Sequence, residues 1–248
     1  MKIYNTTLIM PCFNEGKFFK KEEYIASLKE EEFVNICFVN DGSTDNTLVK
    51  LKELQVLFPN RIQIIDLNKN VGKAEAIRQG VLNYQNTNQS EYIGYFDADL
   101  AFPLNQVRKF YIQLPENKQP TFIVGARVRL HGFTNVERPL MRHLFSRFFA
   151  TIVSNMLKIS IYDTQTGAKL IKENVAKELF SKKFISSWLF DIELIYRLIN
   201  LVGRPKIEKE LWELPISVCN DDGNSSIKKS YAFKVPIELY KIWKKYRK

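Results

Sequence analysis

The sequence contains few cysteines and no long hydrophobic run. Its three cysteines, Cys12, Cys37 and Cys219, are odd in number and far apart, and no Cys-x-x-Cys pair or cysteine–histidine cluster accompanies them. This pattern argues against a disulfide framework and a zinc site, and it favours a reducing, cytoplasmic location. No stretch approaches the roughly 18 consecutive apolar residues of a membrane-spanning helix. The short apolar run before Pro11 lacks a cleavage-site pattern, so we expect neither a signal peptide nor a transmembrane helix.

The glycine-rich loops that commonly hold nucleotide phosphates are also missing. Neither GxGxxG nor GxxxxGK(S/T) occurs, which disfavours a Rossmann dehydrogenase and a P-loop NTPase. A divalent cation offers another way to hold a nucleotide diphosphate, because carboxylates bind the ion and phosphate oxygens complete its coordination.

Positive charge is abundant but local. The net charge of the chain is +10, and residues 127–147 and 228–248 together account for all of it, so the remainder is close to neutral. Two basic segments indicate two surfaces that face anions. A nucleic-acid-binding domain is a competing interpretation, but no recognised binding module surrounds either segment, and we expect no nucleic-acid partner.

Apolar runs rich in β-branched and aromatic residues alternate with segments of helical periodicity. The apolar runs cover residues 6–10, 36–39, 62–67, 92–96 and 122–128. The helical segments cover residues 22–31, 44–58, 73–84, 104–114, 139–157 and 187–201. This alternation predicts an α/β fold, in which a mostly parallel sheet is covered by helices on both faces.

Three short polar motifs follow the predicted strands. PCFNE follows the first strand, NDGS the second and DAD the fourth. Ligands of an open α/β sheet bind at the carboxyl ends of its strands, so these motifs are expected to meet there. Asp97 and Asp99 form a carboxylate pair suited to Mg²⁺ or Mn²⁺. Each motif alone has an ordinary alternative, since Asp41-Gly42 often marks only a turn and a DxD motif often lies in a surface loop.

Taken in order, the motifs resemble family 2 of the inverting glycosyltransferases, which have the GT-A fold. The nucleotide-sugar half is matched by PCFNEG, FVNDGSTDNT, NKNVGKAEAIRQG and YFDADLAF. The later half, with GARVRL, DTQTGAKLI, WLFDIEL and LWELP, resembles the polyprenyl-phosphate hexose synthases. Within these it resembles most the polyprenyl- and dolichyl-phosphate β-glucosyltransferases and the dolichyl-phosphate mannose synthases. The resemblance extends from about residue 6 to residue 215.

This resemblance implies a three-layer α/β/α GT-A domain with a mixed, mainly parallel sheet. It also implies transfer of a hexose, glucose from UDP-glucose, to a polyprenyl phosphate. We interpret residues 1–248 as one catalytic domain: residues 1–125 bind the nucleotide sugar, residues 126–230 bind the acceptor, and residues 231–248 form a basic amphipathic C-terminal helix.

The resemblance assigns roles on the donor side. Asp41 would accept a hydrogen bond from uracil, and Asp97 and Asp99 would bind the metal that neutralises the departing diphosphate. The implied nucleotide-sugar-binding residues are Pro11, Asn14, Glu15, Asp41, Lys73 and Asp97.

The acceptor side can be argued from charge. A lipid phosphate is already ionised near neutral pH, so it needs cations to hold it but no general base. Arginine suits this task because it binds phosphate in a bidentate manner. The spacing places Arg138, Arg142 and Ser146 on one helix face. The predicted phosphate ligands are Arg127, Arg129, Arg138, Arg142 and Ser146. The alternative is that Arg138, Arg142 and Arg147 are solvated helix charges.

Two further carboxylates, Asp163 and Asp191, are candidate catalytic residues together with Asp99. Asp191 lies among apolar residues at a helix start, where burial would raise its pKa towards that of a base. In an alternative function, the protein would transfer sugar to a glycan hydroxyl in cell-surface polysaccharide synthesis, with Asp191 as the general base. With a phosphate acceptor, Asp191 would instead orient the sugar or an arginine. The resemblance to the related families implies that Asp163 faces the reaction centre.

The C-terminal segment has a helical pattern from about Pro236. Glu238, Lys241, Lys245 and Lys248 fall in one stripe, and apolar or aromatic residues cover most of the rest. Such a helix either packs on the domain or lies at a membrane interface with its lysines on anionic lipid. The second placement would make the protein peripheral on the cytoplasmic membrane face.

Overall fold

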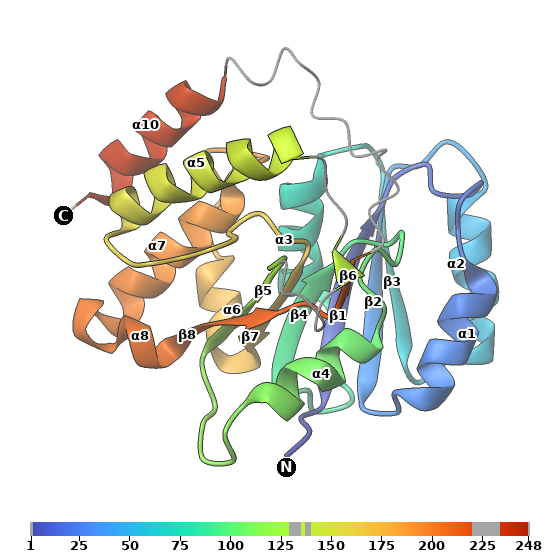
Figure 1. Cartoon of the computed structure of the whole chain (residues 1–248). Helices are drawn as coiled ribbons and strands as arrows, with labels where there is room; N and C mark the ends of the chain where they lie inside the picture. The colour runs from blue at the N-terminus through green and yellow to red at the C-terminus, as the bar shows by residue number, and fades with distance from the viewer. Residues whose placement is uncertain (1, 129–134, 137–139, 220–233, 248) are drawn as a thin grey trace.

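The computed structural model describes residues 2–128, 135–136, 140–219 and 234–247, and it leaves out the side chains of residues 135–136, 140–145 and 218–219. Its centre is a seven-stranded sheet with the strand order β3-β2-β1-β4-β7-β5-β8 (Figure 1). The strands are β1 (Thr6–Cys12), β2 (Val34–Asp41), β3 (Ile62–Leu67), β4 (Tyr92–Phe96), β5 (Phe122–Ala126), β7 (Ala168–Lys172) and β8 (Leu211–Pro215). A separate pair joins β6 (Asn135–Val136) to β9 (Val218–Cys219).

Strand directions in the main sheet are mixed but mainly parallel. β1, β2, β3 and β4 run parallel to one another, and β5 runs parallel to β8. Among the described strands of this sheet, β7 alone is antiparallel to its neighbours, β4 and β5. The predicted fold class is therefore confirmed.

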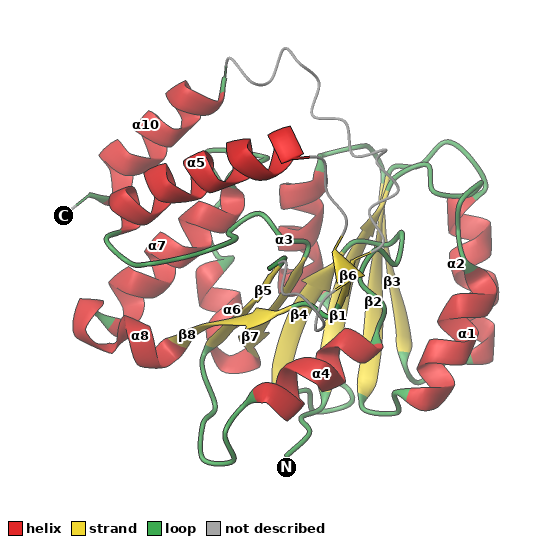
Figure 2. Ribbon diagram, in the orientation of Figure 1, coloured by secondary structure: helices red, strands yellow, loops and turns green. Residues whose placement is uncertain are grey.

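Helices cover both faces of this sheet, which gives three layers (Figure 2). One face packs against α1 (Lys21–Glu30), α2 (Thr47–Leu57) and α4 (Asn105–Gln113). The other packs against α3 (Lys73–Asn83), α5 (Leu140–Leu157), α6 (Glu173–Leu179), α7 (Phe190–Val202), α8 (Ile207–Glu210) and α10 (Val235–Tyr246). A short 3₁₀ helix, η1 (Arg204–Lys206), connects α7 to α8.

Successive strand residues enter opposite cores, as the pleat requires. In β1, Leu8 and Met10 belong to one core and Ile9 to the other. Because helices cover both faces of the sheet, the central strands are mainly apolar along their length. For this reason the strands in the first half of the chain could be predicted from apolar runs in the sequence. The strand cysteines Cys12 and Cys37 are buried free thiols, and burial raises the pKa of Cys37 to about 12.

Helix α10 packs on the domain. Leu239 and Ile242 are buried in the same core as α7, and the ring of Tyr246 stacks on that of Tyr196 with centroids 5.5 Å apart. The hydroxyl of Ser186 donates a hydrogen bond of 2.5 Å to Glu238 Oε2. Of the two placements considered for this helix, the structure thus shows contact with the domain. No helix in the described part of the chain is long and apolar enough to cross a bilayer.

A buried glutamate of α7 gives stability a specific pH dependence. Glu193 is fully buried, and its Oε1 accepts hydrogen bonds from the backbone of Ile185 at 2.7 Å and Ser186 at 3.0 Å. Burial raises the pKa of Glu193 above the ordinary 4.5. Its contribution to stability is therefore complete below pH 4.5 and is lost as the pH rises through the folded-state pKa.

We expect Glu193→Gln to remove this pH dependence, because the amide oxygen can still accept the backbone hydrogen bonds. Relative to wild type, the variant should gain stability as the pH rises from 4.5 towards 8. Urea unfolding at a series of pH values measures the difference, with the exposed Glu208→Gln as control. A difference that stays constant with pH would contradict the prediction.

Candidate active site

A cleft of about 320 Å³ opens at the carboxyl ends of β1, β2 and β4. We call it the carboxyl-end cleft. It brings together six of the residues predicted from the sequence, namely Pro11, Glu15, Asp41, Lys73, Asp97 and Asp99. Asn70 and Gly72, from the loop before α3, also line the cleft and were not predicted.

Asn14 has a different place. It does not line the cleft but joins the loops after β1 and β2, because its Oδ1 accepts a hydrogen bond of 2.9 Å from the amide of Thr44. The backbone N–H of Asn14 donates a hydrogen bond of 3.0 Å to Ser43 Oγ. The backbone of Asn14 is left-handed, with φ of 54°, a conformation that asparagine tolerates. Asn14 thus links the loop after β1, which lines the cleft, to the loop after β2.

Asp41 fixes the loop that precedes α3. The side chain is buried, and its two oxygens accept hydrogen bonds from the amides of Val71 at 2.7 Å and Gly72 at 2.9 Å. Gly72 has φ of 87°, which favours glycine. Each carboxylate oxygen has a further lone pair, so Asp41 can accept another N–H from a ligand in the cleft.

Negative charge is concentrated around Asp97 and Asp99. Partial burial in the cleft and the charge of Asp97 raise the pKa of Asp99. Burial, followed by the charges of Asp99 and Asp97, raises the pKa of Glu15. Lys73 Nζ forms an ion pair with Asp97 Oδ1. Such a cluster of carboxylates favours a bound cation.

The described residues contain no group of three or more histidine, cysteine or acidic side chains arranged to hold a metal ion. Two carboxylates are nevertheless sufficient where a substrate supplies the other ligands. Mg²⁺ is commonly bound by one or two carboxylates together with substrate phosphates and water. Asp97 and Asp99 fit that kind of site.

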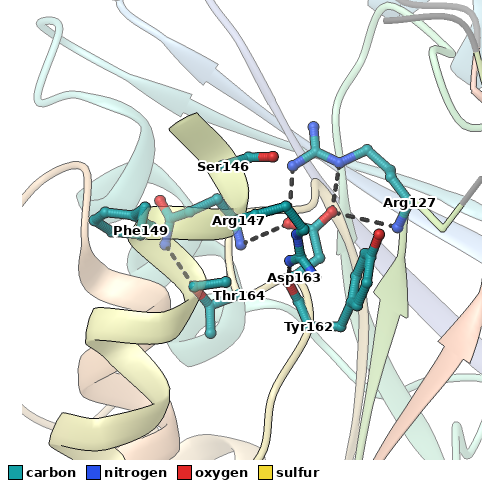
Figure 3. Close-up of a pocket in the computed structure, with 9 residues that line it drawn as sticks. Arg127, Ser146, Arg147, Phe149, Tyr162, Asp163 and Thr164 are labelled. Atoms are coloured by element: carbon teal, nitrogen blue, oxygen red, sulfur yellow. Dashed lines mark hydrogen bonds and ion pairs between the residues drawn. The ribbon is translucent and has the colours of Figure 1, made fainter. Parts of the chain in front are cut away.

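A second, smaller cavity of about 50 Å³ lies beside α5 (Figure 3). Arg127 and Asp163 both line it and form a bidentate ion pair, with Nε–Oδ2 of 2.7 Å and Nη2–Oδ1 of 2.9 Å. Ser146 of α5 also lines this cavity. Arg129 and Arg138 lie outside the described residues, and Arg142 falls in the part of α5 whose side chains are not described.

Arg147 and Glu213 were not predicted as site residues, yet they hold the loop that carries Asp163. The guanidinium of Arg147 lies 3.3 Å from the ring centroid of Tyr162 and donates a hydrogen bond to the Tyr162 carbonyl. Its Nε is buried and has no hydrogen-bond partner among the described residues. Arg147 is therefore not the solvated helix charge considered above.

Glu213 of β8 accepts hydrogen bonds from the amides of Tyr162 at 2.7 Å and Asp163 at 2.8 Å. Burial raises the pKa of its carboxyl group. An acidic residue inside the LWELP strand is the sequence signal that could have identified it, since a buried charge needs a partner.

Asp191 lies at the start of α7 and lines neither cavity. Its side chain is buried, and its Oδ1 lies 2.9 Å from Lys169 Nζ and accepts a hydrogen bond of 2.5 Å from the Tyr95 hydroxyl. The expected burial of Asp191 is confirmed. The contact with a buried lysine was not foreseen.

The two cavities are joined by residues 163–167. Asp163 lies in the smaller cavity, while Gly167 packs against the carboxylate of Asp97 in the carboxyl-end cleft. A β carbon on Gly167 would stand 2.8 Å from Asp97 Cγ and closer still to Oδ2. Residues 163–167 therefore link a residue that lines the smaller cavity to one that contacts Asp97 of the carboxyl-end cleft.

The chain is similar in sequence to known proteins. The model of glycosyl transferase family 2 matches residues 7–180. A dolichyl-phosphate beta-glucosyltransferase of Trichomonas vaginalis is 29% identical over 248 residues, covering 96% of this chain and 70% of the relative. The human dolichyl-phosphate beta-glucosyltransferase is 30% identical over 203 residues, covering 77% and 61% respectively. The chain thus spans between 61% and 70% of the length of these relatives.

A solved structure with the same fold is glucosyl-3-phosphoglycerate synthase from Mycobacterium tuberculosis, in complex with Mn²⁺ and UDP-glucose. The TM-score is 0.68 at 15% sequence identity, and the match covers 97% of this chain and 79% of that one.

Proposed function

This chain belongs to glycosyltransferase family 2, and on that premise we propose that it transfers glucose from UDP-glucose to a polyprenyl phosphate with inversion. The observation that carries the proposal is the junction at residues 163–167. It joins an acidic, nucleotide-sized cleft to a cavity lined by arginine. The named relatives support the acceptor class, since they are dolichyl-phosphate glucosyltransferases.

On the donor side, Asp41 would accept an N–H of the uracil ring with its remaining lone pairs. Mg²⁺ or Mn²⁺ held by Asp97 and Asp99 would neutralise the charge that develops on the leaving diphosphate. Lys73 already lies beside Asp97 and can offer its ammonium to the same phosphates. The charge of Asp97 raises the pKa of Lys73 above its ordinary value, so the side chain stays charged.

On the acceptor side, the phosphate is its own nucleophile and needs only to be held in line. Arg127 and Ser146 line the smaller cavity and would bind it, and Arg147 stands next to them. Arg127 would share its guanidinium between Asp163 and the phosphate. Arg129, Arg138 and Arg142 remain proposed ligands on the grounds of sequence spacing. In this account residues 1–125 serve the donor and residues 126–230 the acceptor.

A glycan hydroxyl is the less favoured acceptor. Its deprotonation needs a general base with an oxygen that faces the reaction centre. Asp191 is only 5% exposed, and its Oδ1 is engaged by Lys169 and Tyr95. These contacts suit a residue that positions others rather than one that removes a proton.

Membrane contact is proposed to be peripheral, on the cytoplasmic face. The outer side of α10 exposes Ile237 and Tyr240, each 57% exposed, together with Lys241 and Lys244. Apolar side chains flanked by lysines suit the surface of an anionic bilayer. Phe148 of α5, near the smaller cavity, is 69% exposed and would add to such a contact.

Lipid extraction tests the proposed function. The protein would be incubated with Mn²⁺, a polyprenyl phosphate and a panel of radiolabelled sugar nucleotides. We expect organic-soluble label from UDP-glucose above the other donors. Label found only on an added oligosaccharide would overturn the proposal and favour the hydroxyl acceptor.

Gly167→Ala should weaken metal binding through Asp97. The added methyl group would overlap the carboxylate and push Asp97 away, because the β carbon would lie 2.8 Å from Cγ. We expect Mn²⁺ affinity in the presence of UDP to fall by about tenfold or more, as for changes that displace a metal ligand. Electron paramagnetic resonance of free Mn²⁺ measures it, with Val56→Ala, a change of an exposed residue on α2, as control. Unchanged affinity in Gly167→Ala would show that Asp97 is not a metal ligand.

A further inference from the structure

Lys169 is a buried lysine that neither the donor nor the acceptor chemistry uses. It belongs to β7, its side chain is completely buried, and its Nζ lies 2.9 Å from Asp191 Oδ1. The same ammonium donates a hydrogen bond to the carbonyl of Thr166. Burial lowers the pKa of Lys169 despite the opposing effect of Asp191.

A buried ion pair is a weak source of stability. The loss of hydration can exceed the attraction between the two charges, and apolar residues of similar size often stabilise a protein equally well. Thermodynamic stability alone therefore does not explain a lysine at this position. Its contacts provide a better explanation.

The partners of the pair flank Asp97 on two sides. On one side is Tyr95, which donates to Asp191 and stands opposite Lys169 in the antiparallel pairing of β4 with β7. On the other side is Thr166, which immediately precedes Gly167, the residue packed against the Asp97 carboxylate. The strand before Asp97 and the turn beside it are thus both tied to Lys169 and Asp191.

We propose that Lys169 and Asp191 are a positioning pair for the Asp97 carboxylate. Lys169 holds the Thr166–Gly167 turn near α7, and Asp191 fixes the position of Tyr95 in β4. Because both segments that contact or precede Asp97 are held in place, the Asp97 carboxylate is confined to one position. The part of this inference that concerns metal binding rests on the proposed function, in which Asp97 is a metal ligand. Neither Lys169 nor Asp191 touches the substrates in this account.

Lys169→Met tests the positioning without any ligand. Methionine keeps much of the side-chain length but loses the ammonium. Hydrogen exchange followed by mass spectrometry, without metal or nucleotide, should show about tenfold faster exchange in peptides covering residues 92–101 and 163–169, because local opening becomes easier. Peptides from α1 and α2 should be unchanged. The control is Lys172→Met, a change in the same strand away from Asp97.

Mn²⁺ binding in the presence of UDP is the second readout. We expect Lys169→Met to weaken it by about 10- to 100-fold, the usual effect of removing a group that orients a metal ligand. Three results would each overturn the inference. The exchange rate could stay unchanged in the two peptides, or it could rise uniformly along the chain. The Mn²⁺ affinity could also stay unchanged in a variant whose local exchange is faster. If wild type itself binds no Mn²⁺ while local exchange responds as expected, the positioning role stands and the proposed function fails.

The double variant Lys169→Met with Asp191→Asn covers the case in which the single variant does not fold. Removing both charges avoids a buried, unpaired carboxylate, which is the main cost of breaking such a pair. We expect the double variant to fold, yet still to show the faster local exchange and the weaker Mn²⁺ binding. Wild-type values for both would mean that the pair serves stability only.

Discussion

Replacement of Asp99 by asparagine is expected to lower kcat/KM for glucosyl transfer by roughly 1,000-fold, because the charge on the leaving diphosphate would lose its counter-ion. Asp99 lies in the carboxyl-end cleft two residues after Asp97, and the two carboxylates are close enough for Asp97 to raise the pKa of Asp99. The amide of asparagine fills the same space but lacks the negative charge. The substitution should therefore slow the chemical step and weaken Mn²⁺ binding.

Asp97→Asn should have an effect of similar size, and the double variant should be little worse than either single one, since the two side chains act as a unit. Steady-state kinetics at saturating Mn²⁺ and acceptor measures the loss. Glu53→Gln serves as control, because Glu53 is a half-exposed carboxylate paired with Lys21 on the surface. Less than a tenfold reduction in Asp99→Asn would contradict the assigned role.

Arg127→Met is expected to raise the KM for polyprenyl phosphate by about 100-fold, the loss associated with removing a charge-assisted, bidentate contact. The KM for UDP-glucose should change little, because Arg127 lines the smaller cavity and not the carboxyl-end cleft. Arg127→Lys keeps the charge but loses the paired N–H donors of the guanidinium. Its KM for polyprenyl phosphate should therefore lie between those of wild type and Arg127→Met.

Folding must be separated from binding in this experiment, since Asp163 loses its ion pair with Arg127 in Arg127→Met. Arg108→Met is the matched control: Arg108 also pairs with a carboxylate, Glu31, at 2.9 Å, but on α4 and away from both cavities. The thermal unfolding of both variants should be compared before the kinetics. A rise in KM confined to the donor would contradict the role of Arg127.

The first half of the fold could be predicted because its signals are local. Strands β2 and β4 are buried and mainly apolar, and a polar motif stands at the end of each, so the cleft residues Asp41, Asp97 and Asp99 followed from strand order. In the second half, the antiparallel strand β7 and the strand β8 gave weaker patterns. Their neighbours in the sheet are distant in sequence, which periodicity does not reveal.

Pairings between charged residues were the main feature that the sequence did not reveal. Arg127 and Asp163 were each predicted as site residues. They are 36 positions apart, however, and nothing in the sequence near either one indicates that they bind each other. Arg147 lies on a helix, where an arginine usually faces solvent, whereas here the ring of Tyr162 covers it. Lys169 offered one signal that was overlooked: a lysine within an apolar strand is rarely buried unless it is paired.

Nuclear magnetic resonance of the purified product tests the central claim most directly. The product would be made from UDP-glucose, Mn²⁺ and a short-chain polyprenyl phosphate. The sugar of UDP-glucose is α-linked, so inverting transfer to a phosphate predicts a glucosyl anomeric proton that is coupled to phosphorus and has the β configuration. An α-configured product, or an anomeric proton without coupling to phosphorus, would contradict the account.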